Sequence, residues 1–344
     1  MGVDMKNIYG YTLGKLEAYF ESIGEKKFKA VQVFEWLYKK RVKSFDEMAN
    51  IKKETIEKMK NDFLMESPVI TTKKVGKDVC KYLFTLEDNE HVEAVLMFHD
   101  YGNSLCVSTQ VGCNMGCKFC ESGRRRKVRN LKVEEMVLQL LRIEEDLNKR
   151  ITHVVLMGIG EPFDNYENVI DFIDILNTGK GIDLGARHIT ISTSGILPKI
   201  RMFMETKKQV NLAISLHAPT NDIRNKIMPI NQAYPLEELI PTLKEYIKKT
   251  NRRLTFEYIL LDGINDTEEC AMKLACLIKG MNAYVNLIPY NETSHIEFKK
   301  SKSENIQKFY DLLKEKNIQV TIRREFGSEV DAACGQLRSK YEEA

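Results

Sequence analysis

Strand and helix patterns that alternate over the second two-thirds of the chain restrict its fold more than any other sequence feature. From residue 104 onward, short apolar segments rich in β-branched residues alternate with longer segments whose apolar residues recur at helical spacing. Strands are expected at 105–110, 151–157, 188–193, 210–216, 254–261 and 284–288, and helices at 132–148, 166–177, 197–206, 236–249 and 267–279. Six such units indicate parallel strands joined by crossover helices. Six are too few for a closed eight-fold barrel, so we predict an α/β fold with an open partial barrel, a (β/α)6 arrangement.

The rest of the chain predicts smaller units on both sides of this barrel. Residues 1–65 show helical spacing at 11–22, 28–41 and 45–61 and form a basic helical module. Residues 66–100 contain three strand patterns separated by turns, which indicates a small antiparallel extension. The barrel is expected to occupy 101–300. A final helix at 304–316 and a strand at 318–323 lead to a small-residue tail within 301–344.

Composition excludes several classes of protein. The chain has 344 residues, of which 43% are hydrophobic and 29% charged, as expected for a globular protein. No segment approaches the roughly 18 apolar residues of a membrane span, and the N-terminus lacks the apolar region of a signal peptide. The eight cysteines do not form a secreted disulfide pattern. We therefore expect a protein of the reducing cytoplasm, where thiols stay available.

Three cysteines spaced Cys113-x-x-x-Cys117-x-x-Cys120 follow the first barrel strand. Three thiolates on one tight loop can hold three irons of a cubic four-iron cluster, which leaves the fourth iron free to bind a small molecule. A zinc site and three buried core thiols are the alternatives. Zinc prefers four closed ligands, and no histidine lies near this loop.

Further polar residues follow the other strands, at the end of the barrel where functional groups collect. The turn Gly158-Ile-Gly-Glu-Pro162 combines glycines, which permit a close backbone approach, with a carboxylate that can pair with an ammonium group. Ser192, Ser215, His217 and Asn291 end or follow later strands and suit contacts with hydroxyl and carboxylate groups. Alone, each would more often be structural.

A basic run directly follows the cysteine loop. The segment 124–132 has six basic residues in nine. Such a run is usually a solvated face, but beside a candidate active site it is also well placed to attract phosphates. Both interpretations are open from the sequence.

Together these motifs closely resemble the RlmN/Cfr family of radical-SAM RNA adenine methyltransferases. The resemblance extends over nearly the whole chain and includes the N-terminal module, Cys106 with the cysteine loop, the glycine turn, and Asp331-Ala-Ala-Cys334-Gly-Gln-Leu337. Two departures are Glu121, where the family usually has Ala or Ser, and Ile159, where Met is common.

The resemblance implies a mechanism that consumes two S-adenosylmethionine molecules. Cys334 would become S-methylcysteine, and a deoxyadenosyl radical would then remove a hydrogen from its methyl group. The methylene radical would add to adenine, and Cys106 would release the product by forming a disulfide with Cys334. Glu93 matches the family's proposed proton acceptor. Covalent and radical steps suit carbon 2 of adenine because that carbon is not nucleophilic.

The resemblance also implies cofactors and partners. Cys113, Cys117 and Cys120 would bind one [4Fe-4S] cluster whose open iron takes S-adenosylmethionine. The cofactor contacts would be Gly160, Glu161, Ser192, Ser215, Leu216, His217 and Asn291. Expected partners are 23S rRNA, tRNA and an electron donor such as flavodoxin or ferredoxin, with no membrane, and the chain is expected to be a monomer.

Two questions of function stay open at this point. Within the family, Pro162 is typical of members that methylate carbon 2, and this is the specificity we expect. The antibiotic-resistance members methylate carbon 8 of the same ribosomal adenosine, and the segment Arg323-Arg-Glu-Phe-Gly327 is slightly closer to that type. The rival from another class is a non-catalytic RNA-binding protein with a structural metal. That rival would explain the thiols and the basic residues, but not the presence of Cys106, Cys334 and Glu93 together.

Overall fold

In the computed structural model, ten strands form one sheet within the described residues, which are 5–293, 295–323 and 341. The strand order is β14-β13-β12-β11-β10-β9-β6-β5-β4-β3. The parallel strands are β6 (Gly102–Cys106), β9 (His153–Leu156), β10 (Ile189–Thr193), β11 (Asn211–Ser215), β12 (Leu254–Leu260), β13 (Ala283–Pro289) and β14 (Gln319–Ile322). Because β3 and β14 are the edges of this sheet, the barrel is open, as predicted.

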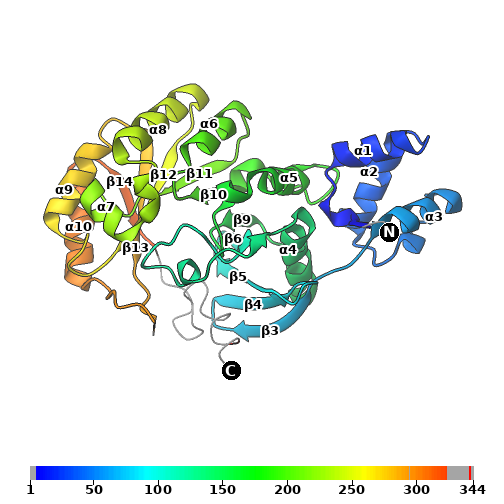
Figure 1. Ribbon diagram of the computed structural model, residues 1–344, viewed down its shortest axis with the longest axis horizontal. Coiled ribbons are helices and arrows are strands. Elements are labelled where there is room, and N and C mark those ends of the chain that lie inside the picture. The colour runs from blue at the N-terminus through cyan, green and yellow to red at the C-terminus, as the bar shows by residue number, and fades with distance from the viewer. Residues whose placement is uncertain (1–4, 294, 324–340, 342–344) are drawn as a thin grey trace.

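Helices connect the parallel strands in the predicted order (Figure 1). They are α4 (Val133–Leu147), α5 (Tyr166–Asn177), α6 (Leu197–Glu205), α8 (Leu236–Thr250), α9 (Glu268–Leu277) and α10 (Ser303–Glu315). A further short helix, α7 (Asn221–Ile227), precedes α8 and was not predicted. It begins at Thr220, whose side chain accepts a hydrogen bond from the Ile223 amide, the usual device for starting a helix.

The first barrel strand ends earlier than its sequence pattern suggests. We predicted a strand at 105–110, whereas β6 ends at Cys106. The amides of Thr109 and Gln110 both donate to the Ile159 carbonyl, at 2.8 and 3.1 Å. Gln110–Val111 then forms β7, which pairs with β8 (Arg129–Asn130). Residues 107–110 therefore leave the sheet and lie against the glycine turn that follows β9.

The antiparallel extension continues the barrel sheet without a break. Its strands are β3 (Val69–Val75), β4 (Val79–Thr85) and β5 (His91–His99), which are the three strands predicted within 66–100. Strand β5 pairs with β6 in antiparallel orientation and places Val95 opposite Cys106. The extension is thus a wall of the same sheet that carries the barrel.

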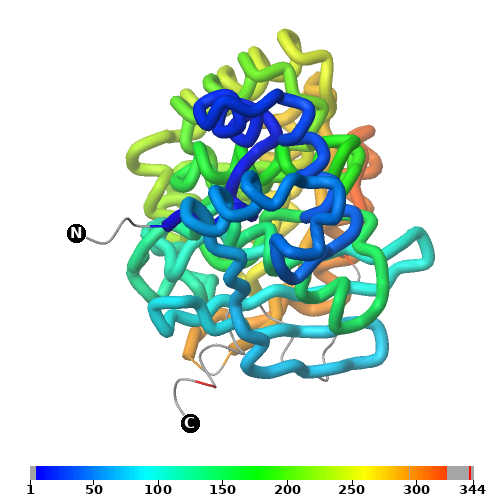
Figure 2. The backbone as a smooth tube through the Cα atoms, turned by 90° about the vertical axis from the view of Figure 1, so that its right-hand side faces the viewer, coloured from blue at the N-terminus to red at the C-terminus, as the bar shows by residue number. Residues whose placement is uncertain are grey.

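The N-terminal module packs at the end of the molecule opposite α9 and α10 (Figures 1 and 2). It contains α1 (Leu13–Ser22), α2 (Phe28–Glu35) and α3 (Lys53–Asp62), and β1 (Lys6–Asn7) pairs with β2 (Phe63–Leu64). We predicted one helix at 28–41, but α2 changes to a π-helical turn at Trp36–Lys40, which ends at Arg41 in the left-handed conformation.

The module and the barrel share one core. Buried apolar residues of α1 and α2 belong to the same continuous cluster as those of the barrel. At the surface, ion pairs Arg41–Glu144 and Lys43–Glu145 join the module to the end of α4. In the described part of the chain, no helix is both long enough and apolar enough to cross a membrane.

Candidate active site

Most of the site residues expected from the sequence line one cavity of about 350 Å³. The cavity lies where the parallel strands end, and the extension strand β5 forms part of its wall. Its lining includes Glu93, Cys106, Cys113, Cys117, Cys120, Gly160, Glu161, Ser192, Ser215, His217 and Asn291. Leu216 does not line it, because its side chain is fully buried in the core. Cys334 lies outside the described residues.

The cysteine loop is held in place by backbone hydrogen bonds. The Cys113 amide donates to the Arg125 carbonyl at 3.0 Å, and the Cys120 amide donates to the Cys117 carbonyl at 3.2 Å. Gly112 has a φ of 76° and lies so close to Arg126 that a Cβ atom would be 2.3 Å from the Arg126 carbonyl oxygen. This tight turn aims the loop at the cavity.

The three thiols share a poorly solvated environment. Burial raises the pKa of Cys113 to about 12, and it raises the pKa of Cys117 and Cys120 as well. The charges of Cys120 and Cys113 also raise the pKa of Cys117, so the sulfurs lie close enough to interact. Without a positive centre these thiols would stay protonated, whereas iron would hold them as thiolates.

The spacing of these thiols bears on the zinc alternative. Within the described residues, no three His, Cys, Asp or Glu side chains are placed to hold a single metal ion. In a four-iron cluster each cysteine binds a different iron, so the three sulfurs need not converge on one point. The donor set and its burial therefore fit a cluster.

The glycine turn after β9 fixes a buried carboxylate. A Cβ on Gly160, whose φ is 111°, would be 2.7 Å from Gln110. Glu161 accepts hydrogen bonds from the amides of Ser194 at 2.7 Å and Phe163 at 3.0 Å. Burial raises the pKa of Glu161, and these hydrogen bonds partly oppose the shift. Such a carboxylate can take an ammonium partner on its cavity side.

His217 lies at the end of β11 as a neutral imidazole. Its Nδ1 accepts a hydrogen bond from the Ile259 amide at 3.0 Å, so the ring carries its proton on Nε2. Burial and the nearby Arg224 charge lower its pKa to about 3. The Phe119 ring packs edge-on against the imidazole, with 4.9 Å between the ring centroids. Nε2 is therefore a fixed hydrogen-bond donor at physiological pH.

Arg224 links the ends of β10 and β11 through hydrogen bonds to backbone carbonyls. It is fully buried, and its guanidinium donates to the carbonyls of Leu216 at 3.1 Å and Ser194 at 2.7 Å. It also donates to the Asn231 side chain at 2.9 Å. Burial lowers the pKa of Arg224 to about 10. Leu216, expected as a cofactor contact, thus has its carbonyl in this internal network.

The wall formed by the extension brings together Cys106, Glu93 and Lys81. Glu93 and Lys81 are 2% and 0% exposed, and Glu93 Oε2 lies 3.2 Å from Lys81 Nζ. Burial raises the pKa of Cys106 to about 11, and the Arg323 charge opposes the shift. Cys106 is a free thiol. Its expected disulfide stays a prediction because Cys334 lies outside the described residues.

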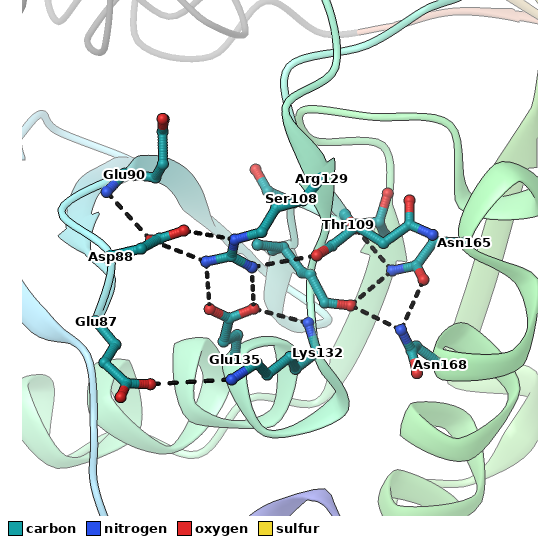
Figure 3. Close-up of polar contacts among 12 residues, drawn as sticks. Glu87, Asp88, Glu90, Ser108, Thr109, Arg129, Lys132, Glu135, Asn165 and Asn168 are labelled. Atoms are coloured by element: carbon teal, nitrogen blue, oxygen red, sulfur yellow. Dashed lines mark hydrogen bonds and ion pairs between the residues drawn. The ribbon is translucent and has the colours of Figure 1, made fainter. Parts of the chain in front are cut away.

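Four of the six basic residues in the run at 124–132 form ion pairs within the protein, which leaves less free charge for phosphates than the sequence alone suggests. Arg129 pairs with both Asp88 and Glu135, as Figure 3 shows, with its shortest contact to each at 2.6 and 2.8 Å. Arg124 pairs with Glu121 at 2.6 Å, and Lys127 pairs with Asp164 at 2.6 Å. The acidic partners are distant in sequence in two of these cases, so charge counting along the chain could not reveal them.

Several residues that line the cavity were not predicted as site residues from the sequence. Glu257 on β12 is buried, lines the cavity and accepts a hydrogen bond from Asn286 at 2.9 Å. Arg323 lines the cavity just after β14. Glu121, noted only as a departure, is also buried in the lining and accepts a hydrogen bond from Thr293 at 3.1 Å. Inward-facing charged residues within strand patterns are the signal that could have found Glu257 and Lys81.

Comparison with known proteins identifies both parts of the chain. Residues 107–275 match the radical SAM superfamily, and residues 6–65 match the ribosomal RNA large subunit methyltransferase N-terminal domain. A probable dual-specificity RNA methyltransferase RlmN from Spiroplasma citri is 51% identical over 342 residues, covering 98% of this chain and 99% of that protein. Its counterpart from Caldanaerobacter subterraneus subsp. tengcongensis is 51% identical over 339 residues, with the same coverage.

A solved structure shows the same architecture over nearly the whole length. The crystal structure of a radical SAM methyltransferase from Sphaerobacter thermophilus superposes with a TM-score of 0.90 at 38% identity. The alignment covers 96% of this chain and 98% of that one. The two chains therefore share their fold over nearly their whole aligned lengths.

Proposed function

The chain belongs to the RlmN family of radical-SAM RNA methyltransferases, and from this we propose that it methylates carbon 2 of an adenosine in 23S rRNA and of an adenosine in tRNA. The observation that carries the proposal is the convergence of three separate sets of residues on one cavity. These sets are the three thiols of the cysteine loop, the polar groups at the strand ends, and the Glu93–Cys106 wall. A non-catalytic RNA-binding protein would not need the third set.

Membership of the superfamily implies S-adenosylmethionine and a [4Fe-4S] cluster. Cys113, Cys117 and Cys120 would hold the cluster. When bound, the cluster and S-adenosylmethionine supply one-electron chemistry that can activate a methyl group for attack on an electron-poor ring carbon. The buried, closely spaced thiols of this loop support the assignment because they need a cationic partner to ionise.

The polar residues of the cavity would orient S-adenosylmethionine. Glu161 would accept hydrogen bonds from its ammonium group, since the carboxylate is fixed by two backbone amides. His217 would donate from Nε2, and Ser192 and Ser215, whose hydroxyls lie 3.4 Å apart, would contact hydroxyl or carboxylate groups. Gly160 would admit the ligand close to the backbone. Asn291 would contribute from the exposed rim.

Three residues of the chain would handle the methyl group and the RNA. Cys334 would accept the methyl group and carry it to adenine. Glu93 would accept the proton that leaves the ring carbon. Cys106 would attack the sulfur of Cys334, forming an S–S bond as the C–S bond to the product breaks. Support for the last two roles is their place on paired strands, because Val95, two residues after Glu93, lies directly opposite Cys106.

RNA recognition would rest mainly on the N-terminal module. Its family match is to an rRNA methyltransferase domain, and residues 1–60 carry 13 basic and 9 acidic residues. The run at 124–132 is less suited because four of its six basic residues form ion pairs within the protein. A flavodoxin or ferredoxin would deliver electrons to the cluster.

The product of the reaction tests the proposal. The chain is reconstituted anaerobically and incubated with protein-free 23S rRNA, or with tRNA, together with S-adenosylmethionine and a reductant. The RNA is then digested, and methyladenosines are separated and identified by mass spectrometry. We expect 2-methyladenosine from both RNAs. Appearance of 8-methyladenosine instead would reassign the chain to the resistance type, and absence of both with an intact cluster would refute the substrate assignment.

A further inference from the structure

An ion pair with almost no solvent exposure lies in the wall of the cavity. Lys81 on β4 is 0% exposed and Glu93 on β5 is 2% exposed, with 3.2 Å between Nζ and Oε2. Lys81 is opposite Val95 in the strand pairing, and Leu83 is opposite Glu93. The two charged residues are therefore diagonal neighbours on the same face of the sheet. Val95 is in turn opposite Cys106 on β6.

Stability does not account for this pair. Taking two charges out of water costs several kcal/mol for each ion, and apolar replacements of such pairs are often neutral or stabilising. The strand positions around it are already apolar, since Val79, Val95 and Met97 line the same cavity. Apolar residues at positions 81 and 93 would continue that wall. The pair is better explained by a need for charge at this place in the cavity.

The charge that the cavity needs is that of Glu93. A carboxyl group buried among apolar side chains keeps its proton, and a protonated acid cannot accept another. An ammonium group at hydrogen-bonding distance favours the ionised form. It also restricts the orientation of the carboxylate.

We propose that Lys81 is a positioning residue that supplies the counter-charge to the Glu93 carboxylate and aims it into the cavity as the proton acceptor of the methyl-transfer reaction. The proposal deepens the function proposed above and rests on its assignment of Glu93. In the step concerned, the proton that leaves the ring carbon binds a Glu93 oxygen and the carboxylate becomes a neutral acid.

Three variants and one control separate this role from a structural one. The variants are Lys81→Met, Glu93→Gln and the double variant. The control is Lys73→Met on β3, because Lys73 pairs with Asp146 and does not line the cavity. For each we measure the thermal midpoint of the cluster-free chain, S-adenosylmethionine cleavage, methylated RNA, and RNA that stays covalently attached to the protein on a denaturing gel.

The expected pattern differs between stability and turnover. Lys81→Met should lower the midpoint because it removes the ammonium group that faces the buried Glu93 carboxylate, and the double variant should recover most of that loss. All three variants should lose methylated RNA about a hundredfold or more, the usual size of a general-base contribution, and should accumulate attached RNA. The Lys73→Met control should form methylated RNA like the wild type and should not accumulate attached RNA.

The outcomes distinguish this inference from the function beneath it. If Glu93→Gln turns over normally, the assignment of Glu93 in the proposed function is wrong. If Glu93→Gln accumulates attached RNA but Lys81→Met methylates RNA like the wild type, the role of Lys81 is wrong. If Lys81→Met fails to fold, Lys81→Gln takes its place, because it keeps a polar side chain but no charge: attached RNA with that variant supports the role of Lys81, and normal methylation overturns it.

Discussion

Replacing His217 with glutamine should make the stability of the chain less dependent on pH. In the folded chain, Nδ1 of His217 accepts the Ile259 amide, so a proton at that nitrogen would face another N–H group. Burial and the Arg224 charge lower the pKa of His217 to about 3. In the unfolded chain its pKa returns to about 6.5.

The size of the effect follows from the two pKa values. Because the folded pKa is lowered, the stabilising contribution is fully present above pH 6.5 and is lost as pH falls, since only the unfolded chain takes up the proton. Between pH 7 and pH 5 this lowers the free energy of unfolding by about 2 kcal/mol. Any folded pKa below about 4 gives nearly the same value. Glutamine does not titrate and so lacks this contribution.

Urea unfolding of paired samples at pH 7, 6 and 5 measures the difference. At pH 7 the His217→Gln variant should be less stable by about 1 kcal/mol, the net worth of a buried hydrogen bond. At pH 5 the variant should be at least as stable as the wild type, because only the wild type has lost the His217 contribution. Other titrating groups act equally on both chains. His188→Gln controls for replacing an exposed histidine. A stability difference that stays constant over this range would refute the buried, neutral His217.

Three further variants probe the site. Cys106→Ala should keep the cluster but trap RNA attached to Cys334, which a denaturing gel would detect; normal turnover would remove its role in product release. Cys334→Ala should still cleave S-adenosylmethionine slowly but form no methylated RNA, and any product would exclude the methyl-cysteine route. Gly158→Ala should cost about 1–3 kcal/mol in unfolding experiments and weaken S-adenosylmethionine binding in calorimetry, because a Cβ would be 2.6 Å from the Val107 carbonyl oxygen and 2.7 Å from the Ser108 nitrogen. Unchanged binding would mean that the turn can yield.

The sequence predicted the parts of the fold that local patterns determine. The strands of the extension and the barrel, and the helices between them, follow from apolar periodicity and turn residues. The gathering of Glu161, Ser192 and His217 at one cavity also follows, because parallel strands end at the same edge of a sheet. The glycine turn and cysteine loop take their predicted positions after the first two barrel strands.

Features that depend on long-range pairing were not predictable in the same way. The sequence left open whether the run at 124–132 is a solvated face or a phosphate-binding surface. The structure pairs Arg129 with Asp88, which lies in the turn after β4 and 41 residues earlier in the chain. Arg224 gave no signal because its partners are backbone carbonyls at the ends of other strands. The early end of β6 reflects the competing Ile159 carbonyl, which accepts both the Thr109 and Gln110 amides.

One sheet runs from the extension through the barrel, and this limits how the enzyme can move. No flexible linker separates the wall that holds Glu93 from the strands that surround the cofactor, because β5 and β6 are hydrogen-bonded from Val95 to His99. The position of Glu93 relative to the barrel strands is therefore set by the register of the β5–β6 pairing. A one-residue insertion before Glu93 would extend the turn between β4 and β5 and leave Glu93 in place. An insertion between Glu93 and Val95 would move Glu93 to the face of the sheet that points away from the cavity. Variants designed to change RNA specificity should therefore alter the loops and leave the β5–β6 pairing unchanged.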